Sequence, residues 1–251
     1  MKIYRFLHAG RPSIGVADGD RILRYSGSDA MTLGEATSDS IALADAALLA
    51  PVTPSKIVAV GRNYAEHAKE LGNEAPSEPI IFLKPPTALL DPNGTIVRPP
   101  QSQRVDFEGE LAIIVGKSAR NIRRDDWRSV VLGFTCANDV TARDLQKKDV
   151  QFTRGKSFDT FLPLGPCIET ELDPAALSLR TRVNGQTKQD GNTHDMVFDC
   201  ATIIEFITSI MTLNPGDVIL TGTPSGVGPL NAGDRVEVEI EGIGVLGNSV
   251  S

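Results

Sequence analysis

The stretch VDFEGELAIIVG, residues 105–116, decides the fold. The positions that follow Glu110 are apolar on both faces, a pattern typical of a strand buried inside a sheet. Glu108 and Glu110 stand two apart at the head of this run, so the period of a strand points both side chains the same way. Two like charges that enter a core together are strongly unfavourable unless a cation or a shared proton compensates them. The pattern therefore predicts a divalent metal ion here or, as the alternative, an exposed strand end.

Shorter strand patterns surround this run on both sides. Turn dipeptides separate them: Asp18-Gly19, Asn93-Gly94 and Asn184-Gly185. Helical patterns are fewer and occupy residues 40–50, a short segment that carries His67 and stops at Gly72, and residues 200–211. Strands and helices do not alternate regularly, which argues against a doubly wound parallel sheet. We therefore predict an α+β fold that is mostly β, with mixed but mainly antiparallel pairing.

The stretch PVTPSK, residues 51–56, is the best candidate for a linker. It has two prolines within four residues and lies between periodic segments. A chain of 251 residues is long enough for two units. We expect a small N-terminal α+β unit over residues 1–52 and a larger domain over residues 53–251.

Composition excludes several classes of partner. The formal net charge is -7 and the basic residues are scattered, so a nucleic-acid partner is not expected and a small molecule is. No apolar run is long enough for a membrane span, and the start lacks the apolar core of a signal peptide, so we expect a cytoplasmic protein. Cys136, Cys167 and Cys200 follow no metal or disulfide spacing and are expected to be buried free thiols.

Four further side chains could complete a site around the two glutamates. Asp139 follows an apolar run and precedes a polar helical pattern, so it is either a metal ligand or a helix N-cap. Arg143 and Gln146 share one helix face and together suit a carboxylate, although a solvated helix has the same spacing. Lys156 needs an anionic neighbour if it is buried. Three carboxylates, one divalent ion and one ammonium group are neutral together, and an all-oxygen ligand set favours Mg²⁺ or Mn²⁺.

Two other segments carry candidate chemistry. His67 and Glu70 are one helical turn apart, which suits a general base and the carboxylate that orients it, or an ordinary solvated helix. The stretch DVILTGTPSGVGP, residues 217–229, is rich in glycine but lacks the lysine and the following helix of a phosphate-binding loop. Its backbone can still approach a small ligand closely, with Thr223 as a hydroxyl donor.

Taken in order, these segments resemble the fumarylacetoacetate hydrolase family. The resemblance covers most of residues 56–250 and is carried by seven segments: VGRNYAEHAKELG, FLKPPTALL, VDFEGELAIIVG, NDVTARDLQ, RGKSF, VNGQTKQDGNT and LTGTPSGVGP. Each segment alone is a weak signal, but their joint order is distinctive.

The resemblance implies a catalytic domain of mixed β-roll type, usually a homodimer, that binds Mg²⁺ or Mn²⁺. By position, the implied metal ligands are Glu108, Glu110 and Asp139. The implied catalytic residues are His67, Glu70 and Lys156, with the histidine and glutamate on a short helix that acts as a lid. The implied substrate-binding residues are Arg62, Arg143, Gln146 and Thr223.

The activity implied by the resemblance concerns small 2-oxo acids. Cleavage of a carbon–carbon bond through a metal-held enolate ranks first, either as acylpyruvate hydrolysis or as oxaloacetate decarboxylation. The alternative is an isomerase or tautomerase of 5-carboxymethyl-2-hydroxymuconate or 2-hydroxyhepta-2,4-diene-1,7-dioate type, which belongs to aromatic catabolism. A hypothesis of another class is a metal-stabilised binding module without catalysis.

Overall fold

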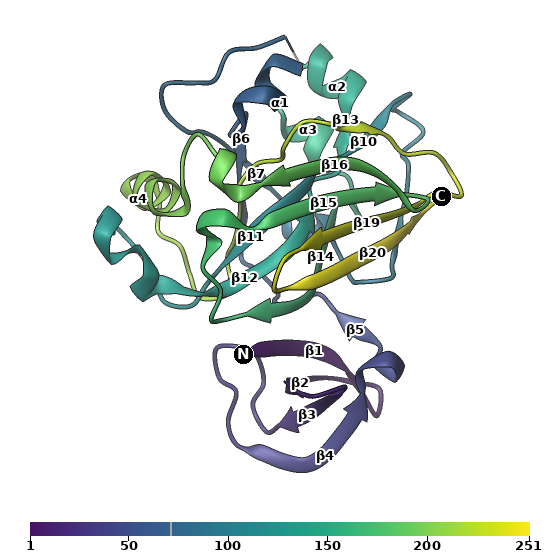
Figure 1. The fold of residues 1–251 in the computed structure, drawn as a ribbon, viewed down its shortest axis with the longest axis vertical. Helices are drawn as coiled ribbons and strands as arrows, with labels where there is room; N and C mark the ends of the chain where they lie inside the picture. The colour runs from purple at the N-terminus through teal and green to yellow at the C-terminus, as the bar shows by residue number, and fades with distance from the viewer. Residues whose placement is uncertain (71) are drawn as a thin grey trace.

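The computed structural model describes residues 1–70 and 72–251. Within these residues the strands form three sheets, and most pairs are antiparallel. Figure 1 shows a small lobe of N-terminal strands below a larger body, with three short helices at the far end of that body. The predicted α+β, mostly β class is confirmed.

The largest sheet has twelve strands and runs through both parts of the molecule. Its main path is β4 (Ala36–Ala42), β3 (Arg21–Tyr25), β2 (Arg11–Asp18), β1 (Lys2–His8), β14 (Leu162–Glu169), β12 (Val131–Asn138), β11 (Gly109–Val115), β17 (Val218–Leu220), β6 (Ile57–Gly61) and β7 (Ile80–Lys84). Two short strands lie off this path: β5 (Leu48–Leu49), which pairs with β1, and β8 (Leu89–Leu90), which pairs with β14.

Two smaller sheets and the helices complete the described fold. One sheet has the order β13 (Thr141–Ala142), β10 (Val105–Phe107) and β18 (Gly228–Pro229). The other has the order β16 (Gln186–Asn192), β15 (Ser178–Val183), β19 (Arg235–Ile240), β20 (Gly244–Val250) and β9 (Thr95–Ile96). The α-helices are α1 (Ala65–Glu70), α2 (Arg143–Lys148), α3 (Thr153–Lys156) and α4 (Cys200–Ile210). The 3₁₀ segments are η1 (Leu43–Asp45), η2 (Pro86–Ala88), η3 (Arg124–Val130), η4 (Pro174–Ala176) and η5 (Thr193–Asp195).

Strand β11 is buried along its whole length, as its apolar run predicts. Leu111, Ile113 and Val115 pack in one core, which includes the apolar face of α4. Ala112 and Ile114 pack in a second core on the other face, together with residues of the N-terminal lobe. Apolar surface removed from water on both faces therefore fixes this strand in the middle of the sheet.

The register between β11 and β12 brings distant acidic residues together. Glu110 lies opposite Ala137 and Gly109 opposite Asn138, so Asp139 comes next to Glu108. The backbone N–H of Asp139 donates to the carbonyl of Glu108 at 2.8 Å. Residues 105–115 do not form one continuous strand, because at Glu108 the chain leaves one sheet (β10) and enters another (β11).

The helix predicted over residues 40–50 is wrong. This segment forms the end of β4, then η1, then β5. Ile41 pairs with Ile22 of β3, and Leu49 pairs with Arg5 of β1, so its apolar side chains are partly buried by strand pairing and not by a helix face. Tertiary pairing here overrides the helix propensity of an alanine-rich stretch. The N-terminal lobe thus has strands and one 3₁₀ turn in place of the expected α+β unit.

Two other local predictions are confirmed, and one is shifted by a residue. The first hairpin turns at Gly19-Asp20 and not at Asp18-Gly19, because Asp18 pairs with Arg21. The second turns at Asn184-Gly185 as predicted, and the backbone φ angles of both residues are positive, as a two-residue hairpin turn requires. Helix α4 begins after Asp199, whose carboxylate accepts the N–H of Thr202 at 2.8 Å as an N-cap.

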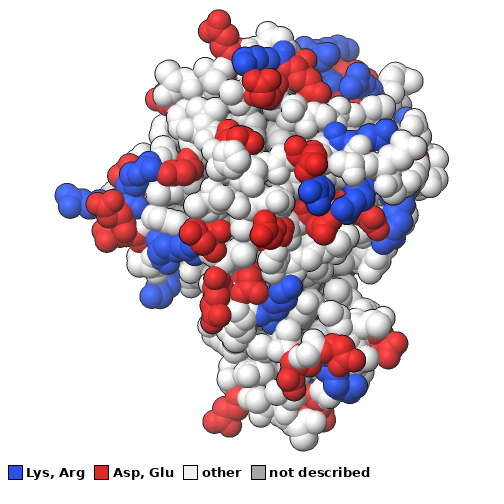
Figure 2. All heavy atoms as spheres, viewed as in Figure 1, with Lys and Arg blue, Asp and Glu red and all other residues white. Residues whose placement is uncertain are grey.

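Pairing between β1 and β14 crosses the division proposed at residues 52 and 53, which itself stays a prediction. Acidic and basic side chains are interspersed over the face drawn in Figure 2, without a broad basic surface on that face. Among the described residues, none of the helices has the length and apolar character that crossing a bilayer would require.

Candidate functional site

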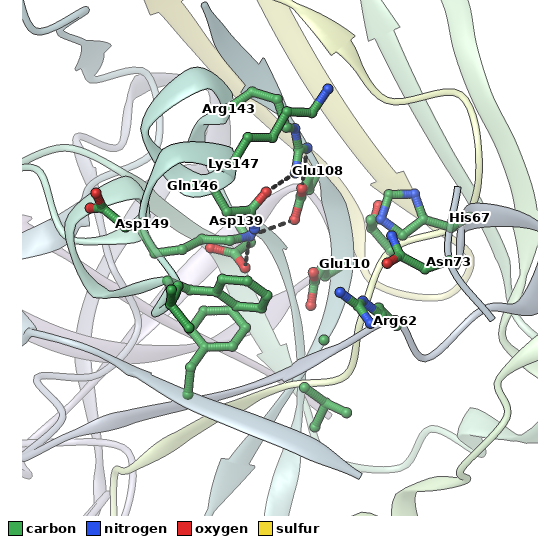
Figure 3. Close-up of a pocket in the computed structure, with 17 residues that line it drawn as sticks. Arg62, His67, Asn73, Glu108, Glu110, Asp139, Arg143, Gln146, Lys147 and Asp149 are labelled. Carbon is green, nitrogen blue, oxygen red and sulfur yellow. Dashed lines mark hydrogen bonds and ion pairs between the residues drawn. The ribbon is translucent and has the colours of Figure 1, made fainter. Parts of the chain in front are cut away.

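A cavity of about 350 Å³ opens at the end of the body where α1, α2 and α3 gather. Every residue predicted for the site except Glu70 lines this cavity. Figure 3 shows Arg62 and His67 on one side, with Arg143 and Gln146 across from them. Segments more than a hundred residues apart in the chain therefore meet at one place, which is the first requirement for a site.

Three carboxylates form the floor of the cavity. Glu108, Glu110 and Asp139 are buried, and each offers an oxygen that lies within 4.8 Å of those of the other two. Burial, together with the neighbouring Asp139 and Glu108 carboxylates, raises the pKa of Glu110 well above its ordinary value. An all-oxygen cluster with uncompensated negative charge is the ligand set that Mg²⁺ or Mn²⁺ prefers. These residues fit a divalent ion, and the exposed strand end considered above is excluded for both glutamates.

Two buried lysines hold the carboxylates from the other side. The Lys156 Nζ donates to Glu108 Oε2 and to Asp139 Oδ2, each at 2.7 Å. The Lys84 Nζ donates to Asp139 Oδ1 at 2.6 Å. Although burial raises the pKa of Glu108, the cations Lys156 and Arg143 outweigh it and lower that pKa on balance. Glu108 and Asp139 are thus compensated by protein cations, whereas Glu110 is not.

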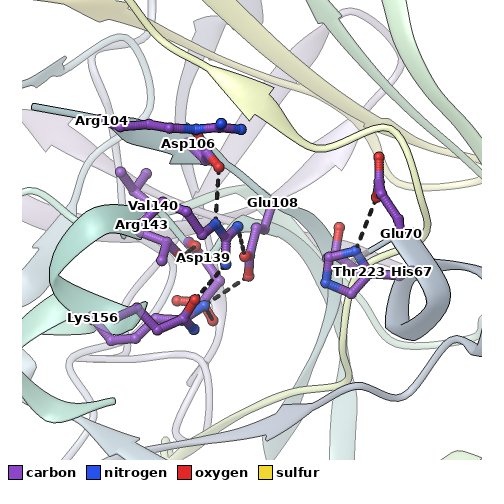
Figure 4. Close-up of polar contacts among 12 residues, drawn as sticks. His67, Glu70, Arg104, Asp106, Glu108, Asp139, Val140, Arg143, Lys156 and Thr223 are labelled. Atoms are coloured by element: carbon purple, nitrogen blue, oxygen red, sulfur yellow. Dashed lines mark hydrogen bonds and ion pairs between the residues drawn. The ribbon is translucent and has the colours of Figure 1, made fainter. Parts of the chain in front are cut away.

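Arg143 is 2% exposed, which excludes the reading of a solvated helix face. Its Nε donates to Asp106 Oδ2 at 2.9 Å, its Nη2 donates to Glu108, and its Nη1 donates to Gln146 Oε1 at 2.6 Å (Figure 4). All three nitrogens of the guanidinium group are therefore engaged by the protein. Of the predicted pair, Gln146 keeps its amide NH₂ group for a ligand.

His67 and Glu70 form the predicted pair on α1. The distance from His67 Nδ1 to Glu70 Oε2 is 3.3 Å, and the imidazole is buried (Figure 4). Burial lowers the pKa of His67 and outweighs the opposing effects of Glu108 and Glu70, so the imidazole is neutral near pH 7. A neutral imidazole held at Nδ1 leaves Nε2 to accept a proton. Glu70 is fixed in turn by the N–H of Gly226, at 3.1 and 3.2 Å from its two oxygens.

Arg62 enters the cavity from a strained backbone. Its φ is +56°, a left-handed conformation that few residues other than glycine adopt. The next residue, Asn63, holds the backbone in this conformation through its side-chain amide. The amide NH₂ donates to the carbonyls of Phe198 and Thr221 at 2.9 and 2.7 Å. The amide oxygen accepts the N–H of Phe198 at 2.8 Å. Within the described chain the Arg62 guanidinium makes no ion pair, which leaves its charge for a ligand.

Two predicted roles change in detail. The hydroxyl of Thr223 donates to the carbonyl of Gly109 at 2.8 Å and accepts from Gln189 Nε2 at 2.7 Å, so its single hydrogen is already used inside the protein. Asp139 is not a helix N-cap, because α2 begins after Ala142 without a side-chain cap. The metal-ligand reading of Asp139 is the one that its surroundings support.

Lys84 and Asp106 belong to the site, and the sequence reasoning missed both. Lys84 ends the apolar run IIFLK, where a lysine that must be buried needs an acidic partner. Asp106 stands two residues before Glu108 in a strand pattern and so shares its face. These patterns indicate that Lys84 and Asp106 need partners. They do not indicate that the partner of Lys84 is Asp139 or that the partner of Asp106 is Arg143.

Comparison with known proteins agrees with this geometry. The family model for the fumarylacetoacetate (FAA) hydrolase C-terminal domain matches residues 56–251, and one for an Rv2993c-like N-terminal domain matches residues 1–51. MJ1656, an uncharacterized protein from Methanocaldococcus jannaschii, is 54% identical over 208 residues, 83% of this chain and 88% of that protein. The mitochondrial oxaloacetate tautomerase FAHD2A of Homo sapiens is 47% identical over 215 residues, 80% of this chain and 68% of that protein.

A solved structure shares the whole fold. The 5-carboxymethyl-2-hydroxymuconate delta-isomerase from Mycobacterium smegmatis is 43% identical, has a TM-score of 0.92, and the match covers 100% of this chain and 99% of that chain. The family model spans most of the sequence and includes every residue of the carboxylate cluster. The chain belongs to the fumarylacetoacetate hydrolase family.

Proposed function

We propose that the protein is an Mg²⁺- or Mn²⁺-dependent enzyme that moves a proton on small 2-oxo dicarboxylic acids by way of their enolates. The observation that carries this proposal is the cluster of Glu108, Glu110 and Asp139, whose candidate ligand oxygens lie within 4.8 Å of one another, beside Lys156 and a neutral imidazole. Bound to these carboxylates, the divalent ion would supply the electrophile that polarises a 2-oxo group.

Charge balance supports a dicarboxylate. The buried groups are four acids and three bases: Asp106, Glu108, Glu110 and Asp139 against Lys84, Arg143 and Lys156. With Arg104, which is paired with Asp106 at 2.8 Å, these groups are neutral together, and Arg62 at the cavity wall adds one positive charge. A divalent ion would add two more positive charges, so the site favours an anionic substrate with two carboxylates. Arg62 is the cation that would bind the carboxylate farther from the metal ligands.

The protein's own groups supply the proton transfer. Lys156 carries an ammonium group at the carboxylate cluster, where it stabilises negative charge that develops on the substrate oxygen. His67, oriented by Glu70, can remove a proton from the carbon next to the 2-oxo group and return it to another position. Transfer and return of one proton amount to tautomerisation or isomerisation.

Carbon–carbon cleavage is the second candidate. The same His67 and Glu70 pair can deprotonate water for attack on an acylpyruvate, and loss of CO₂ from oxaloacetate passes through the same enolate. Sequence reasoning ranks cleavage first. Proton transfer now has more support, because the relatives at 47% and 43% identity bear the names of a tautomerase and an isomerase.

The test is an assay panel with Mg²⁺ and Mn²⁺. Its substrates are oxaloacetate, followed for both tautomerisation and decarboxylation, acetylpyruvate, and a 5-carboxymethyl-2-hydroxymuconate. We expect tautomerisation or isomerisation in the wild type and a rate about 10² to 10⁴ times lower in His67→Ala. His194→Ala is the matched control, because His194 is exposed and lies outside the cavity.

Two results would contradict the first candidate. Acetylpyruvate hydrolysis that depends on His67, with tautomerisation unchanged by His67→Ala, would favour cleavage. No activity on any of these substrates with either metal would favour the non-catalytic metal-stabilised module.

A further inference from the structure

The side chain of Gln189 lies behind the carboxylate cluster and is fully buried. It extends from β16, where it pairs across with Thr181 of β15. Its Oε1 accepts the N–H of Gly109 at 3.0 Å, and its Nε2 donates to Thr223 Oγ1 at 2.7 Å and to the carbonyl of Pro224 at 2.8 Å. Both amide hydrogens and the oxygen are therefore used, which fixes the orientation of the amide.

These bonds close a ring around Gly109, the residue between Glu108 and Glu110. The hydroxyl of Thr223 donates back to the carbonyl of Gly109 at 2.8 Å, so the N–H and the C=O of this glycine are both held. A Cβ at Gly109 would lie 2.1 Å from Thr181 Oγ1, which explains why only glycine allows β11 to approach β15 so closely. The spacing of the two glutamates thus depends on Gln189.

The loop that Gln189 anchors continues to two other groups of the site. At its start, the N–H of Gly222 donates to Glu110 Oε2 at 2.7 Å. At its end, the N–H of Gly226 donates to the Glu70 carboxylate at 3.1 and 3.2 Å. Gly226 lies directly on β16, because a Cβ there would be 2.1 Å from the carbonyl of Lys188. Residues 222–226 therefore connect the carboxylate cluster to the His67–Glu70 pair.

We infer that Gln189 is a positioning residue that sets the geometry of the metal ligands and, through loop 222–226, of Glu70. Gln189 is absent from the cavity lining and acts only through Gly109, Thr223 and Pro224. Its effect on metal binding follows from these contacts alone. Its effect on turnover rests on the proposed function.

The test uses the full chain with two substitutions. Gln189→Met keeps the length and removes all three hydrogen bonds, and Gln189→Glu keeps the acceptor for Gly109 but removes both donors to the loop. The Kd for Mn²⁺ is measured by calorimetry, and kcat and KM are measured at saturating Mn²⁺. We expect the Kd to rise about 10 to 100-fold, and kcat to fall with less change in KM. Gln186→Met and Gln186→Glu, on the exposed side of the same strand, are the matched controls and should match the wild type.

A double variant shows whether Gln189 acts through Thr223. Gln189→Met combined with Thr223→Val should be no worse in Mn²⁺ affinity than the worse single variant, because both changes break the same ring. The inference is overturned if the folded Gln189 variants bind Mn²⁺ as tightly as the wild type and lose only thermal stability. If Gln189→Met does not fold, the Mn²⁺ affinity of Gln189→Glu decides. A raised Kd in a protein that turns over none of the assayed substrates would overturn the proposed function and support the positioning role.

Discussion

Of the three clustered carboxylates, Glu110 is the one whose charge the protein compensates least. Glu108 has Lys156 and Arg143 as partners, and Asp139 has Lys84 and Lys156. Within the described chain the only hydrogen bond to the Glu110 carboxylate comes from the N–H of Gly222. Because its pKa is raised by burial and then by the two neighbouring acids, Glu110 binds a proton more readily than an ordinary glutamate, and a metal ion competes with that proton.

Metal binding should therefore release a proton and strengthen with pH. Below the raised pKa of Glu110 the affinity for Mn²⁺ increases up to about tenfold per pH unit, and above it the affinity levels off. Calorimetry in two buffers of different ionisation enthalpy counts the protons released. Glu110→Gln should lose both the proton release and the tight binding, while Asp149→Asn, at the cavity mouth and paired with Arg154, should lose neither. Equal apparent enthalpies in the two buffers, with a Kd independent of pH, would contradict this account.

Residue types and spacing predict the acidic cluster but not its full set of partners. The spacing of Glu108 and Glu110 indicates a site, because two charges at the head of an apolar run must be compensated by other groups. The partners Lys84 and Asp106, and the support from Gln189, are set by strand pairing over tens of residues, for which a single sequence holds no local signal. The interactions of the Thr223 hydroxyl were missed for the same reason.

At the scale of elements, Asp217 connects the residues that precede β6 to the start of β17. Its carboxylate accepts the N–H groups of Ser55, Lys56 and Asn214 at 3.1, 3.1 and 2.7 Å, and the hydroxyl of Ser55 at 2.6 Å. Strand β6 then leads through Arg62 and Asn63 into the helix that carries His67. The joint between two parallel strands therefore supports the position of α1.

Asp217→Ala should lower the free energy of unfolding by about 3 kcal/mol near pH 7, because it removes the acceptor of four part-buried hydrogen bonds and the partner of Lys56. Although burial raises the pKa of Asp217, hydrogen bonds from Asn214, Lys56 and Ser55 lower it on balance. Its contribution is thus present above the unfolded value, about 3.9, and is lost as pH falls through the folded pKa. Urea titrations at several pH values should show the difference from wild type shrink in acid. Asp190→Ala, at an exposed acid, is the control and should change little.

The element scale also shows where pattern reasoning ends. The apolar run of β11, the hairpin at Asn184-Gly185 and helix α4 were predictable, because each has a period or a turn signal of its own. Residues 40–50 have helix formers, and Asp39 and Ser40 at their start could cap a helix, but their conformation is decided by partners in β3 and β1. Local propensity is a weak guide wherever a sheet edge lies within reach.

At the scale of the whole molecule, the two units implied by the proline-rich stretch share their cores. Ile3 of β1 lies opposite Ile168 of β14 and packs in the same core as Ala112 of β11. Tyr4 and Phe6 belong to the other core, together with Leu111 and Ile113. Neither face of β11 is therefore buried without help from the N-terminal lobe, and the lobe is expected to stabilise the sheet that carries the site.

Calorimetry of the full chain should accordingly show one unfolding transition, with equal calorimetric and van't Hoff enthalpies. Ile3→Ala removes a buried side chain and should lower the Tm of that single transition by roughly 5 to 15 °C, from a cost of about 2 to 5 kcal/mol. Leu7→Ala, at an exposed position of the same strand, is the matched control and should shift the Tm little. If the lobe folds independently, Ile3→Ala will instead split off a separate transition at lower temperature and leave the main one in place. That result would support two autonomous domains divided near residue 53. It would also mean that the N-terminal lobe does not stabilise β11 or the position of Glu110.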